Sequence, residues 1–269
     1  MHIASLLSAG LMAISIPALG EQRMISIGDR RISVYCDGEA AASPTVILIP
    51  AGGRTAEDWS TVRPAVSSFT RACSYDHANF GKSDKAPVKL QSLDEVVDDL
   101  YGWLKASGEK GPFILVSHSN SGFYARRFVT RYPREAAGLV FVDSAHEEQA
   151  LRLHELDPEG PAPNELTARL GWYVKPGQRL EWRTDLPLIV LGTGKPKPRK
   201  ARDGSDSQTN RITEEQFQAW DRIWREFQED LAKRSPRGEF RVAANSGHWI
   251  QRDEPELVIQ AIRDVSRSQ

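Results

Sequence analysis

The sequence predicts an α/β fold: a mostly parallel, doubly wound sheet of about eight strands, with a leading antiparallel hairpin and a small helical cap inserted before the penultimate strand. The sheet is predicted by short apolar runs that alternate with segments of helical spacing, because strands covered on both faces are apolar throughout. The cap is predicted by residues 146–186, which separate two strand patterns by more sequence than a plain crossover needs.

The first half of the chain begins with the hairpin. Residues 25–27 and 31–35 alternate apolar and polar side chains around the turn Gly28-Asp29, which is typical of half-buried strands. The elements expected next are a strand at 45–49 between two prolines, a strand at 71–75 and a helix at 93–105 capped by Ser92.

The second half repeats strand and helix. The expected elements are strands at 113–116, 138–142, 187–191 and 240–243, and helices at 122–132, 213–234 and 256–266. Strands separated by helices run parallel and place the helices on both faces of the sheet. The cap prediction assigns residues 146–186 to an insertion within a single domain at 21–269.

Residues 1–20 are predicted to be a signal peptide. Residues 3–19 are almost continuously apolar or small and end in Ala18-Leu19-Gly20, as in an apolar region followed by a cleavage site. Met1-His2 carries no Lys or Arg, so a buried helix or an uncleaved anchor stays open. We expect a secreted or periplasmic protein with no stable membrane span in the mature chain. A net charge of −1 excludes the electrostatic footprint of a nucleic-acid partner.

Ser119 is the candidate nucleophile. It follows an apolar strand pattern and precedes a helical one, and a sharp strand-to-helix turn is the setting in which a serine is held as a nucleophile. Such turns usually read Gly-x-Ser-x-Gly, but Ser117 and Ser121 stand in place of both glycines. A serine-rich loop without function is the alternative.

His248 is the candidate base that a weakly nucleophilic serine requires. It lies in Ser246-Gly247-His248, between the last strand and the last helix, where loops deliver side chains to the carboxyl edge of a parallel sheet. His118 is adjacent to Ser119, but neighbours on a tight turn point apart, so we expect it to be a packing or supporting residue.

Together these segments resemble the α/β-hydrolases over nearly the whole chain after residue 20. The matching segments are Pro50-Ala51-Gly52-Gly53 with Trp59 downstream, the turn at 75–83, the serine turn, the segment 139–146, and Ser246-Gly247-His248 followed by Asp253-Glu254-Pro255. The resemblance implies that Asp76 stabilises its turn. Asn79 stands where the family commonly has glycine.

The sequence offers more than one candidate for the acidic residue that would orient His248. Many members of the family place it after the strand at 187–191, but no carboxylate follows directly there, and Asp203 and Asp206 come several residues later. The resemblance offers a second position, after the strand at 138–142, which Asp143 occupies. We therefore expect Asp143 to be the acid, while a simple turn-capping role with Ser144 is the alternative.

The resemblance implies further site features. The oxyanion would be bound by the backbone N–H groups of Asn120 and of Gly53, or else of Arg54. The family topology also places the strand of Cys36 beside that of Cys73, so a disulfide is expected if the protein is exported.

The expected function is a serine hydrolase with a Ser119-His248-Asp143 triad, which cleaves small carboxylic esters through an acyl-enzyme. Lactone, amide or carbon–carbon hydrolysis and acyl transfer use the same machinery, and a non-catalytic binding protein is a further alternative. No metal or other cofactor is expected. Arg54, Trp172, Trp182 and Trp249 are candidate pocket residues, although the tryptophans of the insertion fit its own core equally well.

Overall fold

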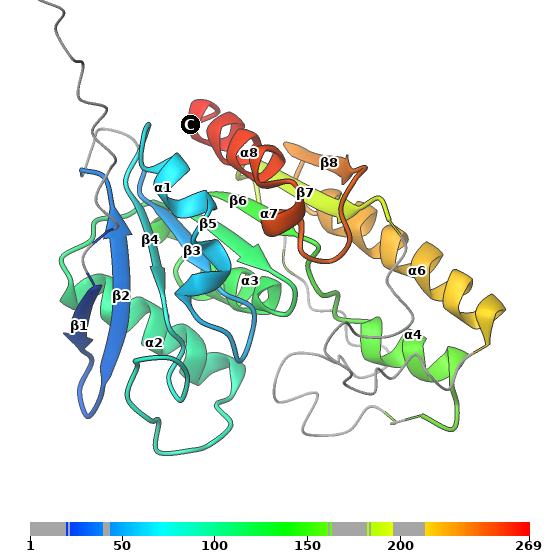
Figure 1. The fold of residues 1–269 in the computed structure, drawn as a ribbon, viewed down its shortest axis with the longest axis horizontal. Helices are drawn as coiled ribbons and strands as arrows, with labels where there is room; N and C mark the ends of the chain where they lie inside the picture. The colour runs from blue at the N-terminus through cyan, green and yellow to red at the C-terminus, as the bar shows by residue number, and fades with distance from the viewer. Residues whose placement is uncertain are drawn as a thin grey trace, which may run out of the picture.

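The eight-stranded sheet is the centre of the molecule (Figure 1). The computed structural model describes residues 20, 22–39, 44–160, 162, 182, 184–195 and 213–269. The strands are β1 (Gln22–Ser26), β2 (Arg31–Asp37), β3 (Val46–Ile49), β4 (Ala72–Tyr75), β5 (Phe113–His118), β6 (Ala136–Val142), β7 (Leu188–Thr193) and β8 (Gly238–Ala243). Their order is β1-β2-β4-β3-β5-β6-β7-β8. β2 runs antiparallel to β1 and β4, and all later neighbours are parallel. The predicted fold class is confirmed.

Helices cover both faces of this sheet. They are η1 (Ala56–Trp59), α1 (Val62–Val66), α2 (Leu93–Ala106), α3 (Ser121–Arg131), η2 (Pro133–Glu135), α4 (Gln149–Leu156), α6 (Glu214–Ala232), α7 (Ile250–Asp253) and α8 (Pro255–Arg267). α1 and α8 pack on one face, whereas α2 and α3 pack on the other. α6 lies along β7 and β8. Ser92 caps α2 in a capping box with Glu95, as the sequence predicts for its start.

The core consists of one apolar layer on each face of the sheet. β5 shows why its sequence is apolar throughout. Phe113 and Leu115 belong to the layer beneath α2 and α3, while Ile114 and Val116 belong to the layer beneath α1 and α8. Successive strand side chains point to opposite faces, so a strand with two covered faces has no position for exposed polar residues.

Several short elements were not predicted. η1, α1, η2 and α7 each span at most five residues, and that is too short for a hydrophobic period to appear in the sequence. β1 begins at Gln22, earlier than the expected strand at 25–27. Of its added residues, Arg23 is exposed and Gln22 and Met24 are only partly buried at the edge of the sheet, so their apolar signal is weak.

A disulfide joins β2 to β4. Cys36 and Cys73 are direct partners in the register of the two strands, and their sulfur atoms are bonded. The bond closes a separation of 37 residues. Glu109 lies close to both sulfurs, but bonded cysteines offer no thiolate to a metal.

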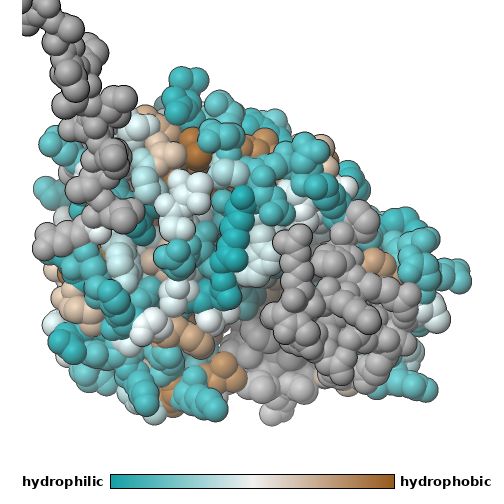
Figure 2. Space-filling model, in the orientation of Figure 1, coloured by the Kyte–Doolittle hydropathy of each residue, from teal (hydrophilic) through white to brown (hydrophobic). Residues whose placement is uncertain are grey.

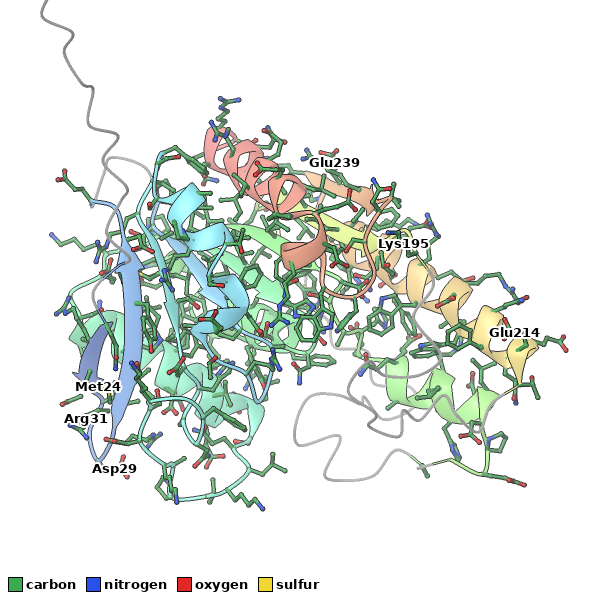
Figure 3. All side chains as sticks on the ribbon, in the orientation of Figure 1. Met24, Asp29, Arg31, Lys195, Glu214 and Glu239 are labelled. Carbon is green, nitrogen blue, oxygen red and sulfur yellow. A yellow bond between two sulfur atoms is a disulfide. The ribbon has the colours of Figure 1, made fainter. Side chains whose placement is uncertain are left out.

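Two of the expected segments fall largely outside the described residues. Residues 1–19 lie outside them entirely. Within the predicted cap, the described residues are 146–160, which include α4, and 162, 182 and 184–186. Lys195, just after β7, and Glu214, at the start of α6, mark the chain on either side of residues 196–212 (Figure 3). Among the helices that the structure describes, none combines the length and the apolar character needed to cross a membrane.

The visible surface is mostly hydrophilic (Figure 2). Large apolar side chains that are exposed among the described residues are Phe80, Val88, Leu90 and Val242. Three of these four belong to the segment between β4 and α2. Exposed apolar side chains are ordinary on the surface of a folded protein, so these four positions by themselves indicate no particular function.

Candidate active site

Ser119 occupies a sharp turn between β5 and α3. Its φ of 57° lies in the left-handed region, which is unfavourable for a residue with a Cβ and must be held by its surroundings. Two backbone hydrogen bonds hold it: Ser119 N–H donates to the oxygen of Val142 at 3.1 Å, and Ala145 N–H donates to the oxygen of Ser119 at 2.9 Å. Val142 is the last residue of β6 and Ala145 lies three residues after it, so the turn is tied to the end of the neighbouring strand.

The two serines that replace the usual glycines are both buried, but they differ in their bonds. Ser121 accepts the N–H of His118 at 2.9 Å, and its hydroxyl lies 3.1 Å from the oxygen of Ile49 at the end of β3. Among the described residues, the Ser117 hydroxyl has no hydrogen-bond partner. Ser121 therefore supports the turn through its hydroxyl, whereas Ser117 does so only by being small.

His248 connects the serine to a carboxylate. Its Nε2 lies 3.1 Å from Ser119 Oγ, and its Nδ1 lies 2.5 Å from Asp143 Oδ2. A carboxylate only accepts, so Nδ1 carries the proton and Nε2 has a lone pair directed at the serine hydroxyl. The structure thus brings together the three residues that the sequence analysis selected.

Asp143 is fully buried at the end of β6, with a φ of 43°. Its second oxygen, Oδ1, accepts the indole N–H of Trp224 at 2.7 Å. The N–H of Thr193 also points to Oδ1 at the longer distance of 3.4 Å. A buried carboxylate needs such donors to remain ionised. The alternative acids, Asp203 and Asp206, lie outside the described residues.

The loop after Asp143 is anchored by two helices. The side-chain amide of Gln228 on α6 accepts the N–H of Ser144 at 3.1 Å and donates to the Ser144 oxygen at 2.8 Å. Arg126 on α3 donates to the oxygen of Ala145 at 3.0 Å. Burial lowers the pKa of Arg126 to about 10, partly offset by Glu147. These contacts fix the backbone that presents the carboxylate.

His118 supports the loop that carries His248. It is buried, and its Nε2–H donates to the backbone oxygen of His248 at 2.9 Å. Its ring also packs against the rings of His248 and Trp249, at centroid distances of 4.6 and 4.8 Å. Burial holds the pKa of His118 well below its ordinary value, and His248 lowers it further. His118 is therefore neutral, in the supporting position expected from the sequence.

The glycine loop after β3 lies against the residue that follows the serine. Gly52 N–H donates to the side-chain oxygen of Asn120 at 2.5 Å, and a Cβ on Gly52 would come within 2.8 Å of Tyr124 Oη. Arg54 N–H donates to the oxygen of Ala51 at 3.0 Å. Among the described residues, the N–H groups of Gly53 and Asn120 have no acceptor. Of the two loop donors expected, Gly53 is the one left available.

The turn at 75–83 braces this loop. Asp76 accepts the N–H of Ala56 and that of Lys82, each at 2.9 Å, so it stabilises the turn as the family resemblance implies. Asn79 has a φ of 74°. This left-handed conformation favours glycine and, next, asparagine, which explains why asparagine can replace the glycine that is common there.

The predicted pocket residues have different surroundings. Trp172 lies outside the described residues. Trp182 is buried against Phe141 and Arg126, and these are contacts of a core residue. Trp249 and Arg54 contact each other beside His248. A cavity of about 460 Å³ lies between α6 and the end of β7, with Trp224 in its wall, but Ser119 does not line it.

Sequence reasoning missed Trp224 and Gln228 as site residues. The spacing of Trp220, Trp224 and Phe227 indicates core packing, and these side chains do form a cluster with Leu153 and Leu156. One signal was available: a buried indole N–H usually has a partner. No feature of the sequence identified that partner as Asp143.

The comparisons with known proteins agree with this architecture. Residues 46–261 match the Alpha/beta hydrolase family. The uncharacterized protein YqjL of Bacillus subtilis is 26% identical over 232 residues, which cover 83% of this chain and 84% of that protein. A putative lipase from Acinetobacter baumannii has a TM-score of 0.63, 18% identity and 93% coverage of both chains. Carboxylesterase CesB from Bacillus subtilis has a TM-score of 0.60 and 16% identity, with 93% of this chain and 92% of that chain covered. The chain belongs to the alpha/beta hydrolase family.

Proposed function

We propose that the protein is a serine hydrolase that cleaves carboxylic esters through an acyl-enzyme on Ser119. The observation that carries this proposal is the continuous hydrogen-bond chain from Ser119 through His248 to Asp143. A hydroxyl is a weak nucleophile until a base removes its proton, and an imidazole is an effective base when a carboxylate orients it. This chain supplies both requirements.

The reaction would proceed in two halves. As Ser119 Oγ attacks the ester carbonyl, its proton moves to His248 Nε2, and Asp143 stabilises the resulting imidazolium. The imidazolium then protonates the departing alcohol, which leaves the acyl group on Ser119. Water attacks the acyl-enzyme with His248 again as base, and the carboxylic acid is released. The buried position of Asp143 supports a role in holding the imidazole rather than in binding substrate.

The oxyanion of each tetrahedral intermediate would be bound by the N–H groups of Gly53 and Asn120. Both lack an acceptor among the described residues. Two donors held by fixed backbone need no reorganisation when the negative charge develops. The hydrogen bond from Gly52 to the Asn120 side chain supports this role, because it holds the two segments together.

A fluorophosphonate probe and a panel of short to long acyl esters test this proposal. We expect the wild type to be labelled and Ser119→Ala to be unlabelled. kcat should fall by at least about 1,000-fold in Ser119→Ala and His248→Ala, and by a similar factor in Asp143→Asn. The double variant Asp203→Asn/Asp206→Asn is the control for the choice of acid and should keep wild-type activity.

Other results would assign a different function. No labelling of the wild type would favour a binding protein on a hydrolase scaffold. Labelling without turnover of any ester would favour lactone, amide or carbon–carbon hydrolysis or acyl transfer. Near-normal turnover in Asp143→Asn would contradict its assignment as the acid.

We also propose that the protein acts outside the reducing cytoplasm. The disulfide between Cys36 and Cys73 supports this location, since such bonds persist in oxidising compartments. Mass spectrometry of protein recovered from the periplasm or medium should find no free thiol and a mature N-terminus close to residue 21. A chain that starts at Met1 and remains in the cytosolic fraction would contradict export.

A further inference from the structure

Two arginines share one tryptophan beside the proposed base. The Arg54 guanidinium lies 5.0 Å from the centre of the Trp249 ring, and the Arg252 guanidinium lies 4.4 Å from it. Trp249 directly follows His248, and the two rings are 5.6 Å apart. Both guanidiniums are therefore held next to the site by attraction to one aromatic ring.

A single carboxylate holds both arginines. Asp58 Oδ1 accepts from Arg54 Nη2 at 2.9 Å and from Arg252 Nη2 at 2.7 Å. The Asp58 side chain is 1% exposed, whereas each arginine side chain is 44% exposed. Two guanidiniums and one carboxylate leave one net positive charge.

Part of each guanidinium remains available. Among the described residues, Nη1 of Arg54 and Nη1 of Arg252 have no hydrogen-bond acceptor. Asp58 accepts from Nε and Nη2 of Arg54 and from Nη2 of Arg252, and the Trp249 ring packs against both guanidiniums. These contacts restrict both groups in advance, so binding an anion would cost little further side-chain freedom. This arrangement suits a planar anion such as a carboxylate.

The pair lies at the rim of the proposed catalytic centre. Arg54 follows Gly53, whose N–H is a proposed oxyanion donor, and Arg252 is four residues after His248. Gly53 and Arg54 are exposed, and His248 and Trp249 are partly exposed. An ester bound with its carbonyl at Ser119 would extend into reach of this charge on one side of the carbonyl.

We propose that Arg54 and Arg252 bind a carboxylate carried by the substrate, so that the preferred substrates are esters with an anionic group near the scissile bond. This inference rests on the proposed ester hydrolase function and names its substrate class. A purely structural role is the competing explanation, in which Asp58 on η1 holds α7 through Arg252 and the loop before η1 through Arg54. Such a role would affect neutral and anionic substrates equally.

Two matched pairs of esters test the proposal on either side of the bond. In the first pair, monophenyl glutarate carries the anion on its acyl group and phenyl pentanoate is its neutral counterpart. In the second pair, 4-carboxyphenyl acetate carries the anion on the alcohol and 4-carbamoylphenyl acetate is its neutral counterpart. We expect the wild type to prefer the anionic ester of at least one pair by about ten-fold in kcat/KM, as for a hydrogen bond to a charged group. That preference should decrease as salt is raised from 20 to 500 mM.

Variants separate the two roles of the arginines. Arg54→Gln and Arg252→Gln should each reduce the anionic-to-neutral ratio by about five- to ten-fold, whereas Arg54→Lys should retain part of it. Arg263→Gln is the matched control. Arg263 belongs to α8 and its guanidinium also lies over an aromatic ring, 4.4 Å from the centre of Phe69, so this variant should keep the wild-type ratio.

The failures of the two proposals are distinguishable. A wild type that hydrolyses both members of each pair equally would overturn the carboxylate site and leave the ester hydrolase intact. Equal losses on anionic and neutral esters in the arginine variants would also overturn it, in favour of the structural role. A wild type that resists fluorophosphonate labelling and cleaves none of the four esters would overturn both.

Discussion

At the scale of single residues, the position of the Asp143 carboxylate depends on Trp224. Asp143 Oδ1 accepts the Trp224 indole N–H at 2.7 Å, a shorter distance than the 3.4 Å to the N–H of Thr193. Trp224→Phe keeps an aromatic ring on α6 but removes this donor. We expect kcat to fall about ten-fold with little change in KM, because one hydrogen bond to a charged group is worth about 1.5 kcal/mol or more.

A second tryptophan provides the control for this substitution. Trp103 is fully buried, and its indole N–H has no partner among the described residues. Trp103→Phe therefore removes similar buried area without changing the site. Steady-state kinetics on a neutral ester compare the two variants, and an equal loss of kcat in both would rule out a positioning role for Trp224.

The buried histidine His118 predicts how stability depends on pH. Its folded-state pKa is held below the ordinary value of 6.5 by burial, so below about pH 6.5 the unfolded chain binds more protons than the folded one. The free energy of unfolding should therefore decrease as pH falls through 6.5, by up to about 1.4 kcal/mol per pH unit for this group. Urea unfolding at pH 7.5, 6.0 and 5.0 measures the slope.

His118→Asn isolates this contribution. The asparagine amide can still donate a hydrogen bond but does not titrate, so the slope of stability against pH should become shallower. His77, whose pKa is also lowered by burial, remains in the variant and keeps a residual slope. A variant with the wild-type slope would show that His118 titrates normally in the folded protein.

Among the secondary-structure elements, helix α6 holds the loop after Asp143 in position. Gln228 bonds both the N–H and the oxygen of Ser144 and is 1% exposed. Gln228→Leu should lower the free energy of unfolding by about 2–4 kcal/mol, because two buried backbone groups would lose their partners. It should also reduce kcat, since Ser144 adjoins Asp143.

The same helix contains a matched control. Gln218 is exposed and bonds only to the Glu214 side chain among the described residues. Gln218→Leu should change stability by less than about 0.5 kcal/mol. Urea unfolding and ester kinetics on both variants provide the comparison. Full activity in a stably folded Gln228→Leu protein would show that the loop keeps its position without α6.

At the scale of the whole molecule, the disulfide joins the antiparallel edge of the sheet to its parallel part. In the unfolded chain the bond closes a loop that spans 37 residues and so limits its conformational freedom. Cys36→Ser/Cys73→Ser should therefore lower the free energy of unfolding by about 2–4 kcal/mol. The folded variant should still react with fluorophosphonate at Ser119. In urea unfolding, a reductant should lower the free energy of unfolding of the wild type by the same amount and leave that of the variant unchanged. A destabilised variant under reductant would show that the reductant acts through something other than this disulfide.

The sheet, the serine turn and the histidine loop could all be predicted from the sequence. These features are local: an apolar strand buried on both faces, a turn of small residues after it, and a helix pattern that begins within a few positions. Local steric and burial preferences act over short stretches, so strand β5, helix α3 and the position of Ser119 could be read directly. The ends of β5 and β6 differ from the predicted ones because their added residues, Ser117, His118, Ala136 and Ala137, are buried but polar or small and extend no apolar run.

Which groups surround those features could not be predicted, because it depends on contacts between distant parts of the chain. Trp224 reaches Asp143 across 81 residues, and Arg252 reaches Asp58 across 194. The sequence shows that a buried indole and a buried carboxylate need partners, but not which ones, because many donors and acceptors satisfy the same requirement. Folding the sheet brings specific pairs within 3 Å of each other, and that selection placed Asp143 beside His248 and two arginines at the rim of the site.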